Sequence, residues 1–221
     1  MMTIFGESAV APTVRRLIPL SPENRKAADL NAPLVHAKLK PRLREWSFRL
    51  TKLINGNEPV RVRLRGLYQI ADEMTAVAAP YAVCKRGCSA CCHMATMVSE
   101  PEAELMAADL GIKMRRPKKW PYFDPHTGVA RAKRDEFADS FFGSHKPCTF
   151  LVNNECSIYE HRPLACRIHL NMAANAEPCE MDTGRETAML DLRKLDDAYA
   201  LIGLSTHLQD IREYFPHGRR K

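Results

Sequence analysis

Long apolar segments are missing from this sequence. No run approaches the roughly 18 consecutive apolar residues that a membrane-spanning helix needs, and residues 1–20 contain no basic stretch leading into an apolar one, as a secretory signal would. With 45% hydrophobic and 27% charged residues, the composition is that of a soluble globular chain rather than a disordered one. We therefore expect a cytoplasmic protein without a membrane segment.

The signatures of common catalytic sites are also missing. The chain contains no Gly-rich phosphate loop, no Gly-x-Ser-x-Gly turn and no His-Glu-x-x-His helix. It has no internal repeat and no long low-complexity segment either. An active site, if the protein is an enzyme, must therefore lie at a bound metal, and the sequence leaves open whether it is one.

Cysteine is absent from the first 80 residues, which hold 13 basic and 7 acidic side chains. Because the whole chain has a net charge of +7, most of its basic excess belongs to this part. A positive charge permits an acidic partner such as nucleic acid without requiring one. We divide the chain into a basic helical N-terminal arm (1–80), a cysteine-cluster metal-binding core (81–170) and C-terminal helices that pack on the core (171–221).

The predicted fold is mainly α with a short β-hairpin, a small α+β metal-binding core wrapped by helices. Four prolines predict an irregular segment over residues 1–33, and helical periodicity begins near Pro41 and stops at Asn55-Gly56. A second amphipathic stretch follows and ends at Pro80. We expect these two helices to form a hairpin that packs on the cysteine region.

Local signals predict further elements along the chain. Ser99 and Glu102 form a capping box for a helix that Gly111 ends. The pair Asn153-Asn154 favours a tight β-hairpin between residues 149–152 and 156–159. The other predicted elements are a basic loop at 112–128 and helices at 129–142, 189–199 and 204–214.

The most informative feature is a set of eight cysteines in two groups. A first group falls within nine residues and a second follows some 55 residues later: Cys84, Cys88, Cys91 and Cys92, then Cys148, Cys156 and Cys166, with Cys179 behind them. Disulfides are rare in a reducing compartment, so such a chain more often binds a metal or a cluster. A disulfide framework is the alternative, because the number of cysteines is even.

Clustered thiolates are soft anionic ligands, which suit zinc, iron or an iron–sulfur cluster. Ligands three or four residues apart can converge on one ion at about 2.3 Å from each sulfur, and Cys84, Cys88 and Cys91 meet this requirement. Neighbouring side chains diverge in regular backbone, so Cys92 serves a second centre or is completed by the later group. Folding must then bring the two groups together.

The cysteines occur in a pattern with defined neighbours: Cys84-x3-Cys88-x2-Cys91-Cys92, then Cys148-Thr-Phe-Leu, then Cys156-Ser-Ile-Tyr-x2-Arg-Pro-x2-Cys166-Arg. Over about residues 81–170, this pattern resembles the YkgJ-type cysteine-cluster family, which is described as zinc- or iron-chelating. The resemblance implies metal chelation by seven cysteines: Cys84, Cys88, Cys91, Cys92, Cys148, Cys156 and Cys166. A related pattern in the longer flagellin lysine N-methylases leaves an iron–sulfur redox or methyl-transfer enzyme as an alternative.

Histidines near the cysteines are candidate additional ligands, because imidazole binds zinc and iron. As ligands, His93 and His169 are favoured over His145 and His161. The alternative for each of the four is an ordinary surface histidine or one that supports the ligands without binding the metal. Cys179 lies outside the family pattern, and we interpret it as a free thiol rather than an eighth ligand.

Two kinds of basic residue lie near or between the cysteine groups. Arg162 and Arg167 flank the last ligand, where a guanidinium either offsets the charge of a multi-thiolate centre or pairs with a surface carboxylate. The loop at 112–128 combines five basic residues with Trp120 and Tyr122, and it either contacts a nucleic acid or is a solvated loop.

These observations predict a cytoplasmic metal-binding protein. Seven thiolates exceed what one structural ion needs, which favours two ions or a cluster. We rank zinc slightly above iron or an iron–sulfur cluster, because the Cys-x2-Cys runs lack ferredoxin-like spacing. The alternative is a zinc-stabilised adaptor that binds nucleic acid or an acidic protein through its basic arm and loop.

Overall fold

The computed structural model describes residues 18–117, 146–179, 186, 188–204 and 208–218. Its helices are α1 (Pro22–Leu39), α2 (Leu43–Asn55), α3 (Val60–Ala78), α4 (Glu100–Leu110), α6 (Leu164–Ile168), α7 (Arg193–Tyr199) and α8 (Ile211–Tyr214). Its strands are β1 (Met97–Val98), β2 (Leu151–Val152), β3 (Glu155–Cys156) and β4 (Gln209–Asp210). The predicted mainly α fold with a short hairpin is confirmed.

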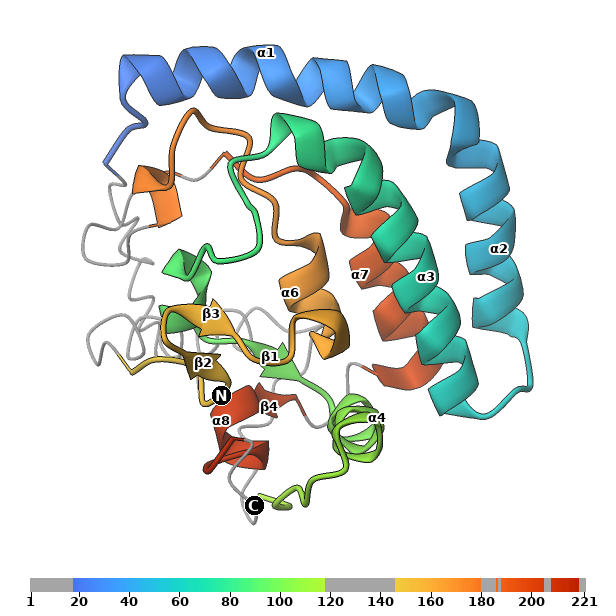
Figure 1. The fold of residues 1–221 in the computed structure, drawn as a ribbon. Coiled ribbons are helices and arrows are strands. Elements are labelled where there is room, and N and C mark those ends of the chain that lie inside the picture. Colours follow the sequence, from blue (N-terminus) through green and yellow to red (C-terminus); the bar gives the residue numbers. More distant parts are fainter. Residues whose placement is uncertain (1–17, 118–145, 180–185, 187, 205–207, 219–221) are drawn as a thin grey trace, which may run out of the picture.

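The long helices form one side of the molecule and the short strands the other (Figure 1). Helices α1 and α2 enclose α3, which also packs against α6 and α7. The strands and α8 lie on the side away from α2 (Figure 1). Within the part of the chain that is described, no helix is both long enough and apolar enough to cross a membrane.

Helix α1 begins earlier than the sequence predicted, so the expectations of an irregular segment up to residue 33 and of helix only from Pro41 were wrong. The Ser21 hydroxyl caps the helix by accepting a hydrogen bond from the Asn24 amide at 3.3 Å, and Pro22 occupies a first-turn position where its missing N–H costs nothing. Pro33 lies inside the helix. Burial of Val35 and Leu39 overrides the local penalty of that proline.

The predicted helix hairpin is present as α2 and α3, which contact each other and are joined by a short turn. Gly66 permits their close approach, because a Cβ there would lie 2.7 Å from Leu53 Cδ2. Trp46 on α2 is almost fully buried, and its indole N–H donates a hydrogen bond to Glu73 on α3 at 2.9 Å. The guanidinium of Arg42 lies over the indole ring.

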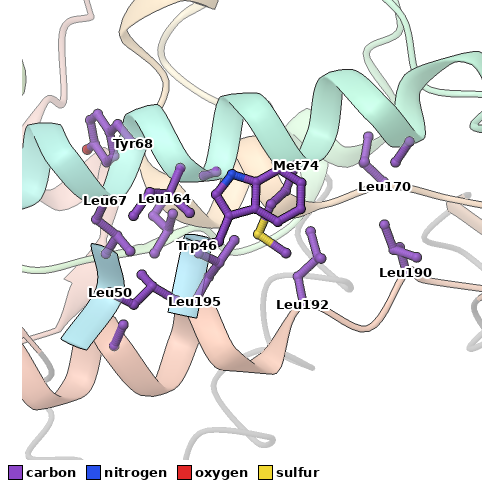
Figure 2. Close-up of a cluster of buried hydrophobic side chains, with 14 of the residues drawn as sticks. Trp46, Leu50, Leu67, Tyr68, Met74, Leu164, Leu170, Leu190, Leu192 and Leu195 are labelled. Atoms are coloured by element: carbon purple, nitrogen blue, oxygen red, sulfur yellow. The ribbon is translucent and has the colours of Figure 1, made fainter. Parts of the chain in front are cut away.

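The larger hydrophobic core lies between these helices (Figure 2). Its labelled members come from α2, α3, α6 and α7 and from the segments flanking α6 and α7: Trp46, Leu50, Leu67, Tyr68, Met74, Leu164, Leu170, Leu190, Leu192 and Leu195. This core joins residues from all three parts into which the sequence was divided, and that division stays a prediction.

Helix α4 has the predicted ends. The Ser99 hydroxyl accepts a hydrogen bond from the Glu102 amide, and Gly111 adopts the left-handed conformation (φ 63°) that ends many helices. The predicted β-hairpin is also confirmed, because β2 and β3 pair across Asn153 and Asn154, both with positive φ.

The C-terminal part differs from its prediction. The expected helix at 204–214 is wrong for residues 209 and 210, which form β4 and pair antiparallel with β1. Asp210 is the N-cap of the short α8. Because an N-cap residue has non-helical backbone angles, α8 does not extend to the residues before it. The helix expected from residue 189 starts only at Arg193, because Met189 bridges to Asn171 instead. The predicted helix at 129–142 lies outside the described residues.

A second, smaller core supports this side of the molecule. It contains eight buried residues around the paired aromatic rings of Phe150 and Phe215, whose centroids are 5.3 Å apart: Val98, Ala103, Met106, Phe150, Ile158, Ile211, Tyr214 and Phe215. Cys148 and Cys156 pack against it, so this core positions part of the cysteine region.

Candidate metal centre

All seven predicted ligand cysteines line a single cavity of about 290 Å³. Its walls come from the end of α3, the turns after it, the β2–β3 hairpin and α6. All eight cysteines of the chain are free thiols, and none forms a disulfide. Three separate stretches of sequence thus contribute thiols to one cavity, which is required if the cysteines are to bind a metal together.

Backbone contacts place the first cysteine group. The Cys84 sulfur accepts a hydrogen bond from the Asn171 amide at 3.3 Å, and the neighbouring amide of Val83 donates to the Asn171 carbonyl at 3.0 Å. Cys91 and Cys92 lie on the 3₁₀ turn Ala90–His93, which allows adjacent side chains to reach the same cavity. In regular backbone the two adjacent side chains would point apart, but in this tight turn both line the cavity.

The second group is joined to the first by a backbone hydrogen bond. The amide of Cys148 donates to the carbonyl of Cys92 at 2.7 Å. Cys156 lies on β3 opposite Leu151, and Cys166 lies on α6. Cys92 is thus the residue of the first group that contacts the later group, and the two alternatives for its ligand role stay predictions.

Arg212, in the C-terminal part of the chain, bridges the two loops that carry cysteines of the first and second groups. Its guanidinium donates hydrogen bonds to the carbonyls of Cys92 and Met94 on one loop and of Lys146 and Pro147 on the other, at 2.9–3.3 Å. Its charge is paired with the fully buried carboxylate of Asp210, which also accepts from the Thr96 amide at 2.8 Å. Sequence analysis missed this pair, since no local pattern shows which carbonyls an arginine will reach.

Glu102 holds α6 in place. One of its buried carboxylate oxygens accepts hydrogen bonds from the Tyr68 hydroxyl at 2.6 Å and from the Leu164 amide at 2.7 Å, and the other accepts from the Tyr199 hydroxyl at 2.8 Å. The Leu164 amide is in the first turn of α6, where amides have no partner within the helix. Burial raises the pKa of Glu102. Sequence analysis gave Glu102 only a capping role in α4.

The two arginines that flank Cys166 have different environments. Arg167 is buried, forms a bidentate ion pair with Asp72 at 2.7 Å and stacks on Tyr68. Arg162 lines the cavity, stacks on Tyr159 and has no carboxylate within ion-pair distance among the described residues. The structure thus separates the two alternatives, with Arg167 paired to a carboxylate and Arg162 facing the thiols.

The thiols influence one another electrostatically. The Cys92 thiol donates a hydrogen bond that lowers the pKa of Cys91 to about 7 and raises that of Cys92 itself. Burial raises the pKa of Cys148 to about 11 and also raises that of Cys166. A cation placed among these groups would favour their thiolate forms, because metal ligation requires the deprotonated sulfur.

The histidines and Cys179 are not equally close to the cavity. His169 lines it, and burial lowers its pKa, which favours the neutral form that binds metals. His161 instead faces Asp109, and His145 lies outside the described residues. The Cys179 thiol is buried behind Cys84 and accepts a hydrogen bond from the Asn171 side chain at 3.3 Å. Its interpretation as a free thiol stays a prediction.

Some of the basic residues outside the cavity form ion pairs. Arg116 of the predicted loop contacts Glu100 and Glu104, and Arg49 on α2 contacts Glu73. Trp120 and Tyr122, on which base stacking was predicted, lie outside the described residues.

The donor set fits a soft metal, because seven thiols and one imidazole line the cavity. In the described parts of the chain, no three Cys, His, Asp or Glu side chains are already arranged as a ligand shell. Convergence on an ion therefore requires rotation of cysteine side chains or a shift of their loops.

Residues 83–185 match a family named CxxCxxCC, whose description is "Putative zinc- or iron-chelating domain". The match includes all eight cysteines and confirms the resemblance predicted from the sequence. Neither the curated proteins nor the solved structures gave a match to the chain. The family match supports metal binding, and the family's description gives zinc and iron as alternatives.

Proposed function

We propose that the seven cysteines lining the cavity are the metal ligands of a cytoplasmic protein, because residues 83–185 match a family described as a zinc- or iron-chelating domain. The observation that carries the proposal is the meeting of thiols from three stretches of sequence in one cavity. Eight free thiols also suit a reducing compartment.

The cysteines divide into two ligand sets in this proposal. Cys84, Cys88 and Cys91 precede the backbone contact between the groups, and the second set consists of Cys92, Cys148, Cys156 and Cys166. A four-thiolate set is a complete ligand shell for zinc, whereas a three-thiolate set needs one more ligand. His169, which lines the same cavity, is available to complete it. We favour zinc slightly over iron for both sets, and an iron–sulfur cluster with redox or methyl-transfer chemistry is the alternative.

Elemental analysis and a visible spectrum of anaerobically purified protein test the proposal. We expect more than one zinc ion per chain and a colourless protein, whereas absorption near 400 nm with bound iron would establish the cluster alternative. Cys88→Ser and Cys156→Ser should each lower the metal content by removing a ligand from a different set.

Cys179→Ser is the matched control, because Cys179 is a nearby buried thiol outside both sets. It should leave the metal content unchanged. Unchanged metal in both Cys88→Ser and Cys156→Ser would show the ligand assignment to be wrong, and metal loss in Cys179→Ser would make Cys179 a ligand.

A further inference from the structure

The cavity is larger than a metal shell alone requires. Its volume of about 290 Å³ is close to the lower end of small-molecule sites, roughly 300 Å³. Apolar side chains such as Ala76, Ala79 and Ile158 line it beside the thiols. The cavity thus offers an apolar surface beside the thiols.

Apart from the cysteines, four residues with charged side chains line the cavity. They are Asp72, Lys85, Arg162 and Arg167. Asp72 and Arg167 neutralise each other through their bidentate ion pair. Lys85 and Arg162 have no carboxylate partner within ion-pair distance in the described part of the chain. These two cationic groups are therefore available to the thiolates of the metal centre or to an anionic ligand.

Arg162 is held in a fixed orientation. Its Nε donates a hydrogen bond to the Tyr159 carbonyl at 2.9 Å, and its guanidinium lies 3.6 Å from the centre of the Tyr159 ring. The ring fixes the guanidinium plane, and no described residue accepts a hydrogen bond from the terminal nitrogens. Two parallel N–H donors in a fixed plane match the two oxygens of a carboxylate or a phosphate.

We propose that the cavity binds a small organic oxyanion, a carboxylate or a phosphate ester, through the terminal nitrogens of Arg162 with Lys85 at the rim. This inference rests on the proposed function in one respect, because it places the ligand beside metal-bearing thiols of the same cavity. The apolar side chains contact the carbon part of the ligand, and the guanidinium sets its orientation.

Isothermal titration calorimetry on the metal-loaded full chain tests the inference, with succinate and inorganic phosphate as probes and neutral succinamide as the matched ligand. We expect an anion to bind and succinamide not to bind. Arg162→Gln should weaken anion binding by about tenfold or more, since it removes a charge-assisted bidentate contact. Arg162→Lys should weaken anion binding to an intermediate degree, because the positive charge remains but the two parallel N–H donors of the guanidinium are lost.

Arg86→Gln is the control variant. Arg86 also faces the Tyr159 ring, but it pairs with Glu160 and does not line the cavity, so its loss should leave anion affinity unchanged. If neither anion binds the wild-type protein, or if Arg162→Gln binds as tightly, the inference is overturned.

Metal content per chain, measured on the same samples, separates this inference from the proposed function. If Arg162→Gln loses metal while the wild type binds no anion, Arg162 only offsets thiolate charge; the oxyanion site is then refuted and the metal site stands. If the wild type holds no metal, the proposed function fails, and anion titration of that protein still decides whether Arg162 binds an oxyanion.

Discussion

Two regions of the molecule are stabilised in different ways. The helical half, which we define as α1, α2, α3 and α7, has helices of up to 19 residues around the larger apolar core. The cysteine half, defined as residues 84–98, 146–158 and 208–218, has two-residue strands and packs on the smaller core, with Cys84 also against the larger one. We therefore expect apolar burial to be the main stabilising contribution in the first region, and hydrogen bonds, one buried ion pair and a bound metal to be more important in the second.

Removing the metal should have the largest effect, and we expect that effect to be greater in the cysteine half than in the helical half. Structural zinc contributes about 10–16 kcal/mol in small zinc domains, which exceeds any single contact described above. After treatment with a chelator, hydrogen exchange should become fast at the amides of residues 84–98 and 146–158 while those of α3 stay protected. Equal deprotection of both halves would show that the two regions are not independently stabilised.

Arg212→Met should have the next largest effect. It leaves the buried Asp210 carboxylate without its cation, which costs about 3–5 kcal/mol for a buried pair. Urea denaturation should show the lower free energy of unfolding. Metal affinity should also fall, because the hydrogen bonds by which Arg212 bridges the two cysteine loops are lost. Arg25→Met, which breaks an exposed pair with Glu186, should cost no more than about 1 kcal/mol.

Leu64→Ala tests the helical half. Leu64 is fully buried on α3, and its truncation should lower the free energy of unfolding by about 2–5 kcal/mol. Metal content per folded chain should stay unchanged, in contrast to Arg212→Met. A loss of metal in Leu64→Ala would show that the larger core also sets the positions of the ligands.

The pH dependence of Glu73 should give the smallest effect. A hydrogen bond from Arg49, followed by one from Trp46, lowers the pKa of Glu73 to about 2. Its stabilisation is therefore complete above the unfolded value of 4.5 and is lost as the pH falls toward 2. The difference in unfolding free energy between wild type and Glu73→Gln should be at most about 1 kcal/mol near neutral pH and should vanish near pH 2. A difference that grows on acidification would contradict this assignment.

Local signals in the sequence predicted the elements whose causes are local. Ser99 and Gly111 set the ends of α4, and Asn153-Asn154 sets the hairpin, through interactions with residues only a few positions away. Ser21 and Pro22 give a local signal for the start of α1, but its continuation through Pro33 could not be predicted because it depends on the burial of Val35 and Leu39 against distant residues. The pairing of β1 with β4 has no local signal, since each strand has two residues and their partners lie more than 100 positions apart.

The same distinction applies to the site. The resemblance to the cysteine-cluster family implied the seven cysteines that line the cavity, because their type and spacing form a recognisable pattern. The contacts that position them are ordinary carboxylates and guanidinium groups, such as Glu102 and Arg212. Their roles depend on which amides and carbonyls the folded chain brings to them, and this information is not present in any short pattern.

The burial of Trp46 has a practical consequence for measuring these differences. The chain contains two tryptophans, so a Trp120→Phe background would make the Trp46 indole the sole source of tryptophan fluorescence. That indole is enclosed in the helical half and fixed by its hydrogen bond to Glu73. Its emission would therefore report the melting of one region, while release of the metal to a colorimetric chelator would report the other, and a thermal scan with both readouts would show whether the two separate.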